Sequence, residues 1–103
     1  MNPRLYFVYI LASKPFGAIY IGMTNDPVTR ILEHREGRGS RHCAKYKIFR
    51  LVHVETFESV DDAIDREKRL KRWRRAWKDA LIAEANPDWH DLFGEMRGDP
   101  LFG

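Results

Sequence analysis

The chain has 103 residues, which is enough for one domain with one hydrophobic core and excludes a second catalytic module. Its hydrophobic content of 44% and aromatic content of 13% exclude global disorder. The net charge of +3 is small, but the basic residues gather in two stretches, which lie between residues 30 and 50 and between residues 66 and 78.

The N-terminal segment is predicted to form a β-hairpin. The residues from Leu5 to Leu11 are all apolar and rich in aromatic and β-branched types, which is typical of a strand covered on both faces and not of a signal peptide. A turn-forming stretch, residues 13–17, leads to a second apolar run from Ala18 to Met23. No run is long enough to span a membrane, and the single cysteine, Cys43, indicates a reducing compartment. We therefore expect a cytoplasmic location.

A first helix is predicted from Pro27 to Glu36, because Asp26 is a favourable N-cap and proline is favoured at the first helical position. It should stop at Gly37, and its buried side is expected to consist of Val28, Ile31 and Leu32. Arg30 and His34 lie one turn apart and should project from the same face. Such a pair could clamp a phosphate and assist proton transfer, although an ordinary exposed helix face can carry the same residues.

Tyr9 and Tyr20 lie in the two strands of the predicted hairpin. Packing alone would explain either ring, but two hydroxyls converging on a cleft could orient or deprotonate a water molecule. A phenol has a reference pKa of about 10, so action as a base near neutrality requires a depression of roughly three units, or about 4 kcal/mol. Arg30 and a bound metal ion could supply it.

The loop that begins at residues 37–40 carries basic side chains, and a third strand is predicted from Ile48 to Phe57. Within this region His42 and Cys43 are adjacent, without the spacing of further ligands that a structural zinc site needs. A cysteine–histidine nucleophile remains an alternative that the residue types alone leave open.

A long helical pattern follows from Ser59, which begins a capping box, to about Ala85, where Asn86 and Pro87 end it. We expect an interruption near the middle of the basic run. An inward stripe at helical spacing is predicted from Ala63, Glu67, Leu70, Trp73 and Trp77. A carboxylate on such a stripe must be paired or bound to metal, and a salt bridge to a basic neighbour is the plainer explanation.

The order strand, strand, helix, strand, helix, helix predicts an α/β (α+β) fold, with a small central antiparallel sheet flanked by helices. Residues 1–92 should form the single domain and residues 93–103 a flexible C-terminal tail. From Arg66 to Lys78, eight basic residues surround Glu67. A basic surface of this size suits a polyanion, although a solvated helix face would also explain it.

Taken together, these residues resemble the GIY-YIG nuclease superfamily, and most of all its small stand-alone bacterial members. The likeness is carried by Tyr9 within Phe7–Ile10, by Tyr20-Ile21-Gly22, and by Arg30, His34 and the later Glu67. It continues through the segment Ala63–Arg74 and through Asn86–Trp89. Phe7-Val8 replaces the Gly-Ile of the first family triplet, and Cys43 stands where relatives often carry a hydroxyl residue.

The resemblance implies a three-stranded antiparallel sheet flanked by helices and a role for each matched residue. Glu67 would be the one protein ligand of Mg²⁺ or Mn²⁺, and Arg30 would clamp the phosphate. Tyr9, Tyr20 and His34 would position and activate water, and Asn86 matches the late asparagine of the family. Contacts to nucleic acid are expected from Arg38, Arg41, Lys45, Lys68, Arg72 and Arg75.

The expected reaction is therefore metal-dependent hydrolysis of phosphodiester bonds in DNA. A non-catalytic nucleic-acid-binding adaptor within a larger repair complex is the alternative, because family nucleases often gain their target from an extra domain. A protein partner could supply that targeting here. A third possibility is that the basic helix is a surface for docking another protein.

Overall fold

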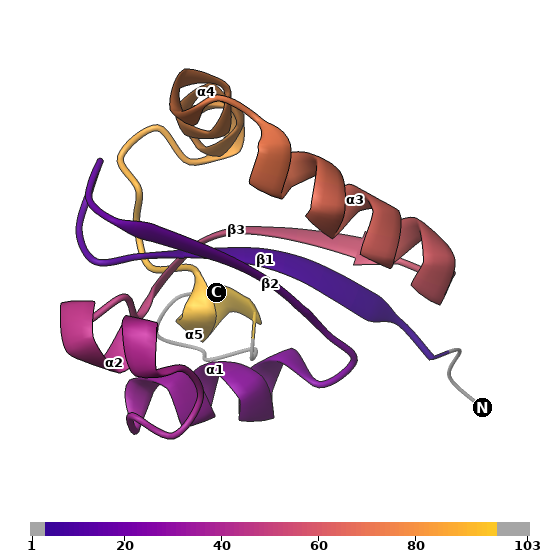
Figure 1. Ribbon diagram of the computed structural model, residues 1–103, viewed down its shortest axis with the longest axis horizontal. Helices are drawn as coiled ribbons and strands as arrows, with labels where there is room; N and C mark the ends of the chain where they lie inside the picture. Colours follow the sequence, from indigo (N-terminus) through magenta and orange to yellow (C-terminus); the bar gives the residue numbers. More distant parts are fainter. Residues whose placement is uncertain (1–3, 97–103) are drawn as a thin grey trace.

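The structure is a computed structural model, and it describes residues 4–96. A three-stranded antiparallel sheet lies between two layers of helices (Figure 1). This confirms the predicted fold class, and the expected order holds with two short helices added, α2 and α5. The elements are β1 (Tyr6–Ala12), β2 (Ile19–Thr24), α1 (Pro27–Arg35), α2 (Arg41–Tyr46), β3 (Arg50–Phe57), α3 (Val60–Arg72), α4 (Arg75–Ala85) and α5 (Phe93–Met96).

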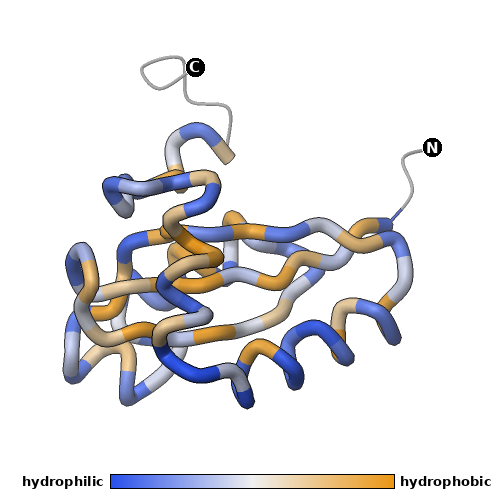
Figure 2. Tube along the Cα trace, turned by 90° about the horizontal axis from the view of Figure 1, so that it is seen from above, coloured by the Kyte–Doolittle hydropathy of each residue, from blue (hydrophilic) through white to orange (hydrophobic). Residues whose placement is uncertain are grey.

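Strand β1 occupies the centre of the sheet, whose order is β2-β1-β3. In the register, Tyr9 pairs with Gly22 of β2 and with Val54 of β3. Residues 8–12 of β1 are all buried, as expected for a strand covered on both faces. Its hydrophobic character is visible in Figure 2, where α3 is by contrast largely hydrophilic.

Successive residues of β1 enter two different cores, because strand side chains alternate between faces. Val8 and Ile10 pack on one face with Ala63 and Leu70 of α3. On the opposite face, Tyr9 belongs to the core that α1, α2 and α5 cover. That second core also contains Leu11, Ile31, Cys43, Ile48, Leu51 and Phe93. The face of Tyr9 is therefore the one that carries α1.

Helix α1 begins as predicted, with Asp26 accepting a hydrogen bond from the backbone N–H of Thr29 at 3.3 Å. It ends at Arg35, one residue earlier than expected. The expectation that Leu32 is buried is wrong, because this residue is 37% exposed. Ile31 is fully buried as predicted, and His34, which was not expected on the buried side, is fully buried as well.

The expected interruption of the long helical pattern is confirmed at Trp73 and Arg74, whose backbone is extended with ψ of 150° at both residues. The predicted inward stripe holds for Ala63 and Leu70, which are buried. It is wrong for Trp77, which is 53% exposed. The stripe assumed one continuous helix, whereas the turn at residues 73–74 gives α4 a new axis and rotates Trp77 outward.

Helix α2 lies in the segment between α1 and β3, with Ser40 accepting a hydrogen bond from the N–H of Cys43. The helix ends at Lys47, whose φ of 55° and ψ of 48° lie in the left-handed region. Strand β3 begins at Arg50, two residues later than predicted, although Ile48 is buried.

The packed part of the chain continues beyond residue 92. Phe93 and Gly94 are buried in α5, at the start of the segment expected to be a flexible tail. The rest of that tail, residues 97–103, lies outside the described residues. Across residues 4–96, none of the helices has the length and apolar character that crossing a membrane requires.

Candidate active site

Four predicted site residues from three elements come together on the α1 face of the sheet. Tyr9 of β1 and Tyr20 of β2 have ring centroids 6.4 Å apart. The His34 ring of α1 lies 5.1 Å from the ring of Tyr20 and 6.0 Å from that of Tyr9. The Tyr9 hydroxyl and His34 Nε2 are hydrogen-bonded at 3.1 Å, and the Arg30 guanidinium interacts electrostatically with both tyrosines.

Two glycines allow these rings to approach the backbone so closely. A Cβ atom at Gly22 would lie 2.4 Å from the Tyr9 hydroxyl oxygen, and one at Gly39 would lie 2.6 Å from His34 Nδ1. Neither space accepts a side chain without movement of a ring. From the sequence, Gly22 was named only as part of the family motif and Gly39 was not named as a site residue, although a glycine inside a strand, as Gly22 is, is a known signal of close backbone approach.

The His34 imidazole is buried and favours its neutral form. Burial, followed by the charge of Arg30, lowers the pKa of His34 below its usual value. Its Nδ1 is also buried and has no hydrogen-bond partner among the described residues. A neutral ring can either accept the Tyr9 proton or donate to the phenol oxygen, depending on the tautomer. The Tyr9 hydroxyl thus has an adjustable partner.

The phenol of Tyr9 keeps its proton at neutral pH. Burial, and after it the neighbouring Tyr20, raises the pKa of Tyr9 to about 12, against the opposing effect of Arg30. That direction is the reverse of the one a tyrosine base requires. Burial acts to lower the pKa of Arg30, but its hydrogen bond to Tyr9 and the charges of the two tyrosines outweigh that effect and raise it. Arg30 is therefore a permanent cation here.

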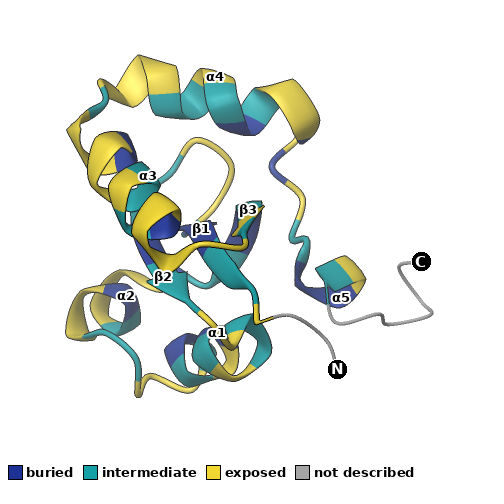
Figure 3. Ribbon diagram, turned by 90° about the vertical axis from the view of Figure 1, so that its right-hand side faces the viewer, coloured by how far each residue is buried: buried dark blue, intermediate teal, exposed yellow. Residues whose placement is uncertain are grey.

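Glu67 lies on α3, across the sheet from α1, and β2 runs between the two helices (Figure 3). A shallow groove of about 280 Å³ follows β2 and is lined by Tyr20 and by Lys71 of α3. Glu67 does not line this groove itself, but it lies next to it, since its Oε1 is 3.7 Å from Nζ of the lining residue Lys71. The carboxylate side chain is 22% exposed, so it is neither buried nor tightly paired.

Asn86 does not join this group, because its amide is committed to the backbone. Its Nδ2 donates to the carbonyl oxygens of Val52 and His90 at 3.1 and 2.9 Å, and its Oδ1 accepts from the His90 N–H at 3.0 Å. These bonds tie the end of α4 to β3. They account for an asparagine at this position without any part in catalysis.

The six basic residues predicted to contact nucleic acid lie on both sides of the sheet. Arg38, Arg41 and Lys45 belong to the α1–α2 side, and the other three, Lys68, Arg72 and Arg75, belong to α3 and α4. Two are already engaged: Arg38 pairs with Glu36 at 2.7 Å, and Arg75 pairs with Asp79 at 2.7 Å and donates to the Gly17 carbonyl. The remaining four have no carboxylate partner within residues 4–96.

A charged cluster that was not predicted from the sequence links β3 to α3. Arg66 donates to both carboxylate oxygens of Glu55, at 2.8 and 3.0 Å, and His53 lies 2.8 Å from the same group. Burial acts to raise the pKa of Glu55, but these hydrogen bonds and the charge of Arg66 lower it to about 2. The cluster ties the middle of α3, next to Glu67, to β3.

Cys43 is fully buried beside Tyr9, and burial raises the pKa of its thiol. A nucleophilic cysteine needs the opposite, an accessible thiol with a lowered pKa. Its neighbour His42 is exposed, and its ring contacts Tyr46 at 4.9 Å. The geometry therefore does not favour the cysteine–histidine alternative.

The chain is similar to several known proteins. The family model described as the GIY-YIG catalytic domain matches residues 5–80. A UPF0213 protein of Halobacterium salinarum is 35% identical over 78 residues, which cover 76% of this chain and 100% of that protein. A UPF0213 protein of Bacillus pumilus is 31% identical over 84 residues, covering 82% of this chain and 85% of its own.

The fold is also similar to a solved structure. The UPF0213 protein of Bacillus halodurans, determined by NMR in solution, has a TM-score of 0.54 and 29% sequence identity to this chain. The match covers 87% of this chain and 95% of that one. The names of these relatives state no reaction.

Proposed function

Since the chain belongs to the GIY-YIG family, we propose that it is a nuclease that hydrolyses phosphodiester bonds in DNA with a divalent metal ion. The observation that carries the proposal is the convergence of Tyr9, Tyr20, His34 and Arg30 beside the groove along β2. Hydroxyl groups, an imidazole and a guanidinium in one place are the groups that phosphodiester hydrolysis uses.

Glu67 is the residue that would hold the metal ion. The one ion pair of its carboxylate among the described residues is the long contact to Lys71, at 3.7 Å, so the carboxylate is free to bind a cation at the border of the groove. Among the described residues, no group of three or more histidine, cysteine or acidic side chains could hold a metal. A single carboxylate suits Mg²⁺, which keeps several of its waters. When bound, the ion would polarise a phosphate oxygen and stabilise the leaving group.

We assign different tasks to the two tyrosines. Tyr9 is buried, and its pKa of about 12 keeps it protonated, which suits a donor that positions Tyr20 and His34. Tyr20 is half-buried and lines the groove, so its hydroxyl is the one that can reach an attacking water. Acting as a base would require the nearby Arg30 and the metal to favour the phenolate.

Arg30 would bind the scissile phosphate. Its side chain is 35% exposed and its ion pair with Glu33 is loose, at 3.6 Å, so the guanidinium can turn to an incoming anion. Neutralising the charge that develops in the transition state is typically worth two to three decades in rate, or about 3–4 kcal/mol. The free cations of α2 and α3 would hold the backbone on either side without reading bases.

A non-catalytic nucleic-acid-binding adaptor is the second candidate. One observation favours it: among the described residues, Glu67 belongs to no group of three or more histidine, cysteine or acidic side chains that could hold a metal ion. An adaptor would bind DNA equally well with and without Mg²⁺ and would leave it intact.

The test is a cleavage assay on single-stranded, nicked and branched DNA, with and without Mg²⁺ or Mn²⁺. Glu67→Ala should abolish cleavage and leave binding largely unchanged. Asp65→Ala is the matched control, because it removes a carboxylate from the same helix that pairs with Arg69 on the exposed face. Metal-dependent cleavage that persists in folded Glu67→Ala would remove this residue from the mechanism, and binding without cleavage on every substrate would favour the adaptor.

A further inference from the structure

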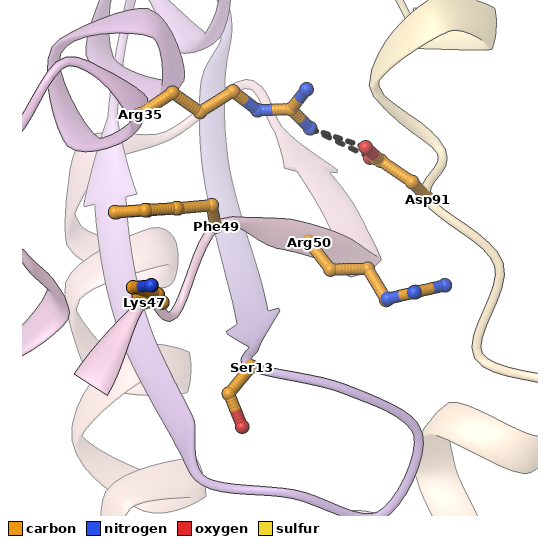
Figure 4. Close-up of a pocket in the computed structure, with 6 residues that line it drawn as sticks. All are labelled: Ser13, Arg35, Lys47, Phe49, Arg50 and Asp91. Atoms are coloured by element: carbon orange, nitrogen blue, oxygen red, sulfur yellow. Dashed lines mark hydrogen bonds and ion pairs between the residues drawn. The ribbon is translucent and has the colours of Figure 1, made fainter.

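A second pocket lies apart from the tyrosines, on the other flank of the α1–α2 layer. It is open, has a volume of about 440 Å³, and falls in the size range of small-molecule sites. It forms where the end of β1, the start of β3, the last residue of α1 and the segment before α5 meet (Figure 4). Its lining residues are Ser13, Arg35, Lys47, Phe49, Arg50 and Asp91.

The charge of this pocket favours an anion. Its one acid, Asp91, is fully engaged, because Arg35 Nη2 donates to its two oxygens at 2.8 and 2.6 Å. Asp91 Oδ1 also accepts from the backbone N–H groups of Leu51 and Phe93. Lys47 and Arg50 therefore keep uncompensated charges, and an anionic ligand would meet two free cations.

The two cations are held in place differently, and both arrangements suit a ligand. Arg50 Nη1 donates to the carbonyl oxygen of Trp89 at 3.1 Å, which orients the guanidinium before anything binds. Lys47 ends α2 with a φ of 55°, a conformation that glycine adopts without strain and lysine does not. The left-handed backbone at the end of α2 fixes where the Lys47 side chain leaves the chain, at the edge of this pocket.

The aromatic side chain completes the pattern. The half-buried side chain of Phe49 lines the pocket and lies between Arg35 and Lys47 in the view of Figure 4, where Arg50 extends to the other side. Phosphate is bound by lysine and arginine, and a nucleobase stacks on an aromatic face. We propose that this pocket binds a phosphorylated nucleotide, with the phosphate on Lys47 and Arg50 and the base against Phe49. This inference goes beyond the proposed cleavage reaction and does not depend on it.

The experiment is a titration of the ¹⁵N-labelled full chain with thymidine 5′-monophosphate, followed by NMR. The amide signals of residues 47–50 and 91 should shift. Thymidine without phosphate and inorganic phosphate without a nucleoside should each bind at least about tenfold more weakly, since each has only part of the contacts.

Lys47→Gly is the sharpest variant, because glycine suits the left-handed backbone while the charge is lost. It should weaken binding of the nucleotide by about tenfold without lowering the melting temperature. Arg69→Ala, on the exposed face of α3 across the sheet, should bind as the wild type does. Glu67→Ala should also bind normally, so a failure of the nuclease proposal would leave this one standing.

Three results would overturn the assignment. The first is unchanged affinity in Lys47→Gly and in Arg50→Gln. The second is binding of inorganic phosphate as tight as that of the nucleotide, which would exclude a base on Phe49. The third is a set of shifted signals confined to the groove of Tyr20.

Discussion

Replacing Tyr9 by phenylalanine should destabilise the fold as well as slow cleavage. The ring would keep its packing, but the hydrogen bond of 3.1 Å to His34 Nε2 would be lost. Because His34 Nδ1 is already without a partner, the buried imidazole would then have neither nitrogen bonded. An unsatisfied buried polar group costs about 1–3 kcal/mol, and relief of the buried phenol hydroxyl offsets part of this.

We therefore expect a loss of about 1–2 kcal/mol in the free energy of unfolding. For a domain of this size, that loss lowers the melting temperature by roughly 5–10 °C. Urea unfolding at pH 8, where histidine is uncharged, would measure it. Tyr20→Phe is the matched control: its ring is half-buried, so it should cost less stability while reducing cleavage more directly.

A double-mutant cycle isolates the bond itself. His34→Leu removes the other partner, and the double variant leaves no polar group unpaired between the two positions. Its loss of unfolding free energy should therefore be smaller than the sum of the two single losses by about 1 kcal/mol. A coupling energy of zero, together with an unchanged melting temperature for Tyr9→Phe, would show that this hydrogen bond contributes nothing to the fold.

Three further predictions concern charge and space. Glu55 has its pKa lowered to about 2 from 4.5, so its contribution of about 3 kcal/mol is present above pH 4.5 and lost as pH falls towards 2; acid unfolding of Glu55→Gln should lack this component. Binding to duplex DNA should weaken with a slope near −0.9 in log K against log salt for each neutralised phosphate. Arg72→Glu should flatten that slope by about one unit, whereas Arg75→Glu should mainly lower the melting temperature, because this residue is bonded within the fold. Gly22→Ala should cost about 1–3 kcal/mol in chemical unfolding, since its methyl group would meet the Tyr9 hydroxyl at 2.4 Å, and unchanged stability would mean that the ring moves freely.

The parts of the fold that local patterns determine could be predicted from the sequence. The apolar run of β1, the Asp26 cap of α1 and the break within the basic run each follow from neighbouring residues. Burial could be predicted less well. The exposure of Trp77 depends on how two helices meet at residues 73–74, and no periodicity within either helix contains that angle.

The candidate site shows the same division. Tyr9, Tyr20 and Arg30 were expected from their positions, but the burial of His34 was not, since it depends on Gly39 returning over the ring after α1 has ended. The second pocket was missed for a related reason. Its residues come from four separate segments, and Lys47 is informative only through its backbone conformation, which the sequence does not reveal.

The central position of β1 has a consequence for how this family can vary. A single inserted or deleted residue before Tyr9 would exchange the two faces of the strand, sending the phenol among Ala63 and Leu70 and an aliphatic side chain to His34. A one-residue shift of β1 would therefore disrupt the candidate site and the packing of both cores at the same time. Length changes should accumulate instead in the exposed turn of residues 14–16, and a chimaera between relatives should transfer β1 together with Gly22 as one uninterrupted block.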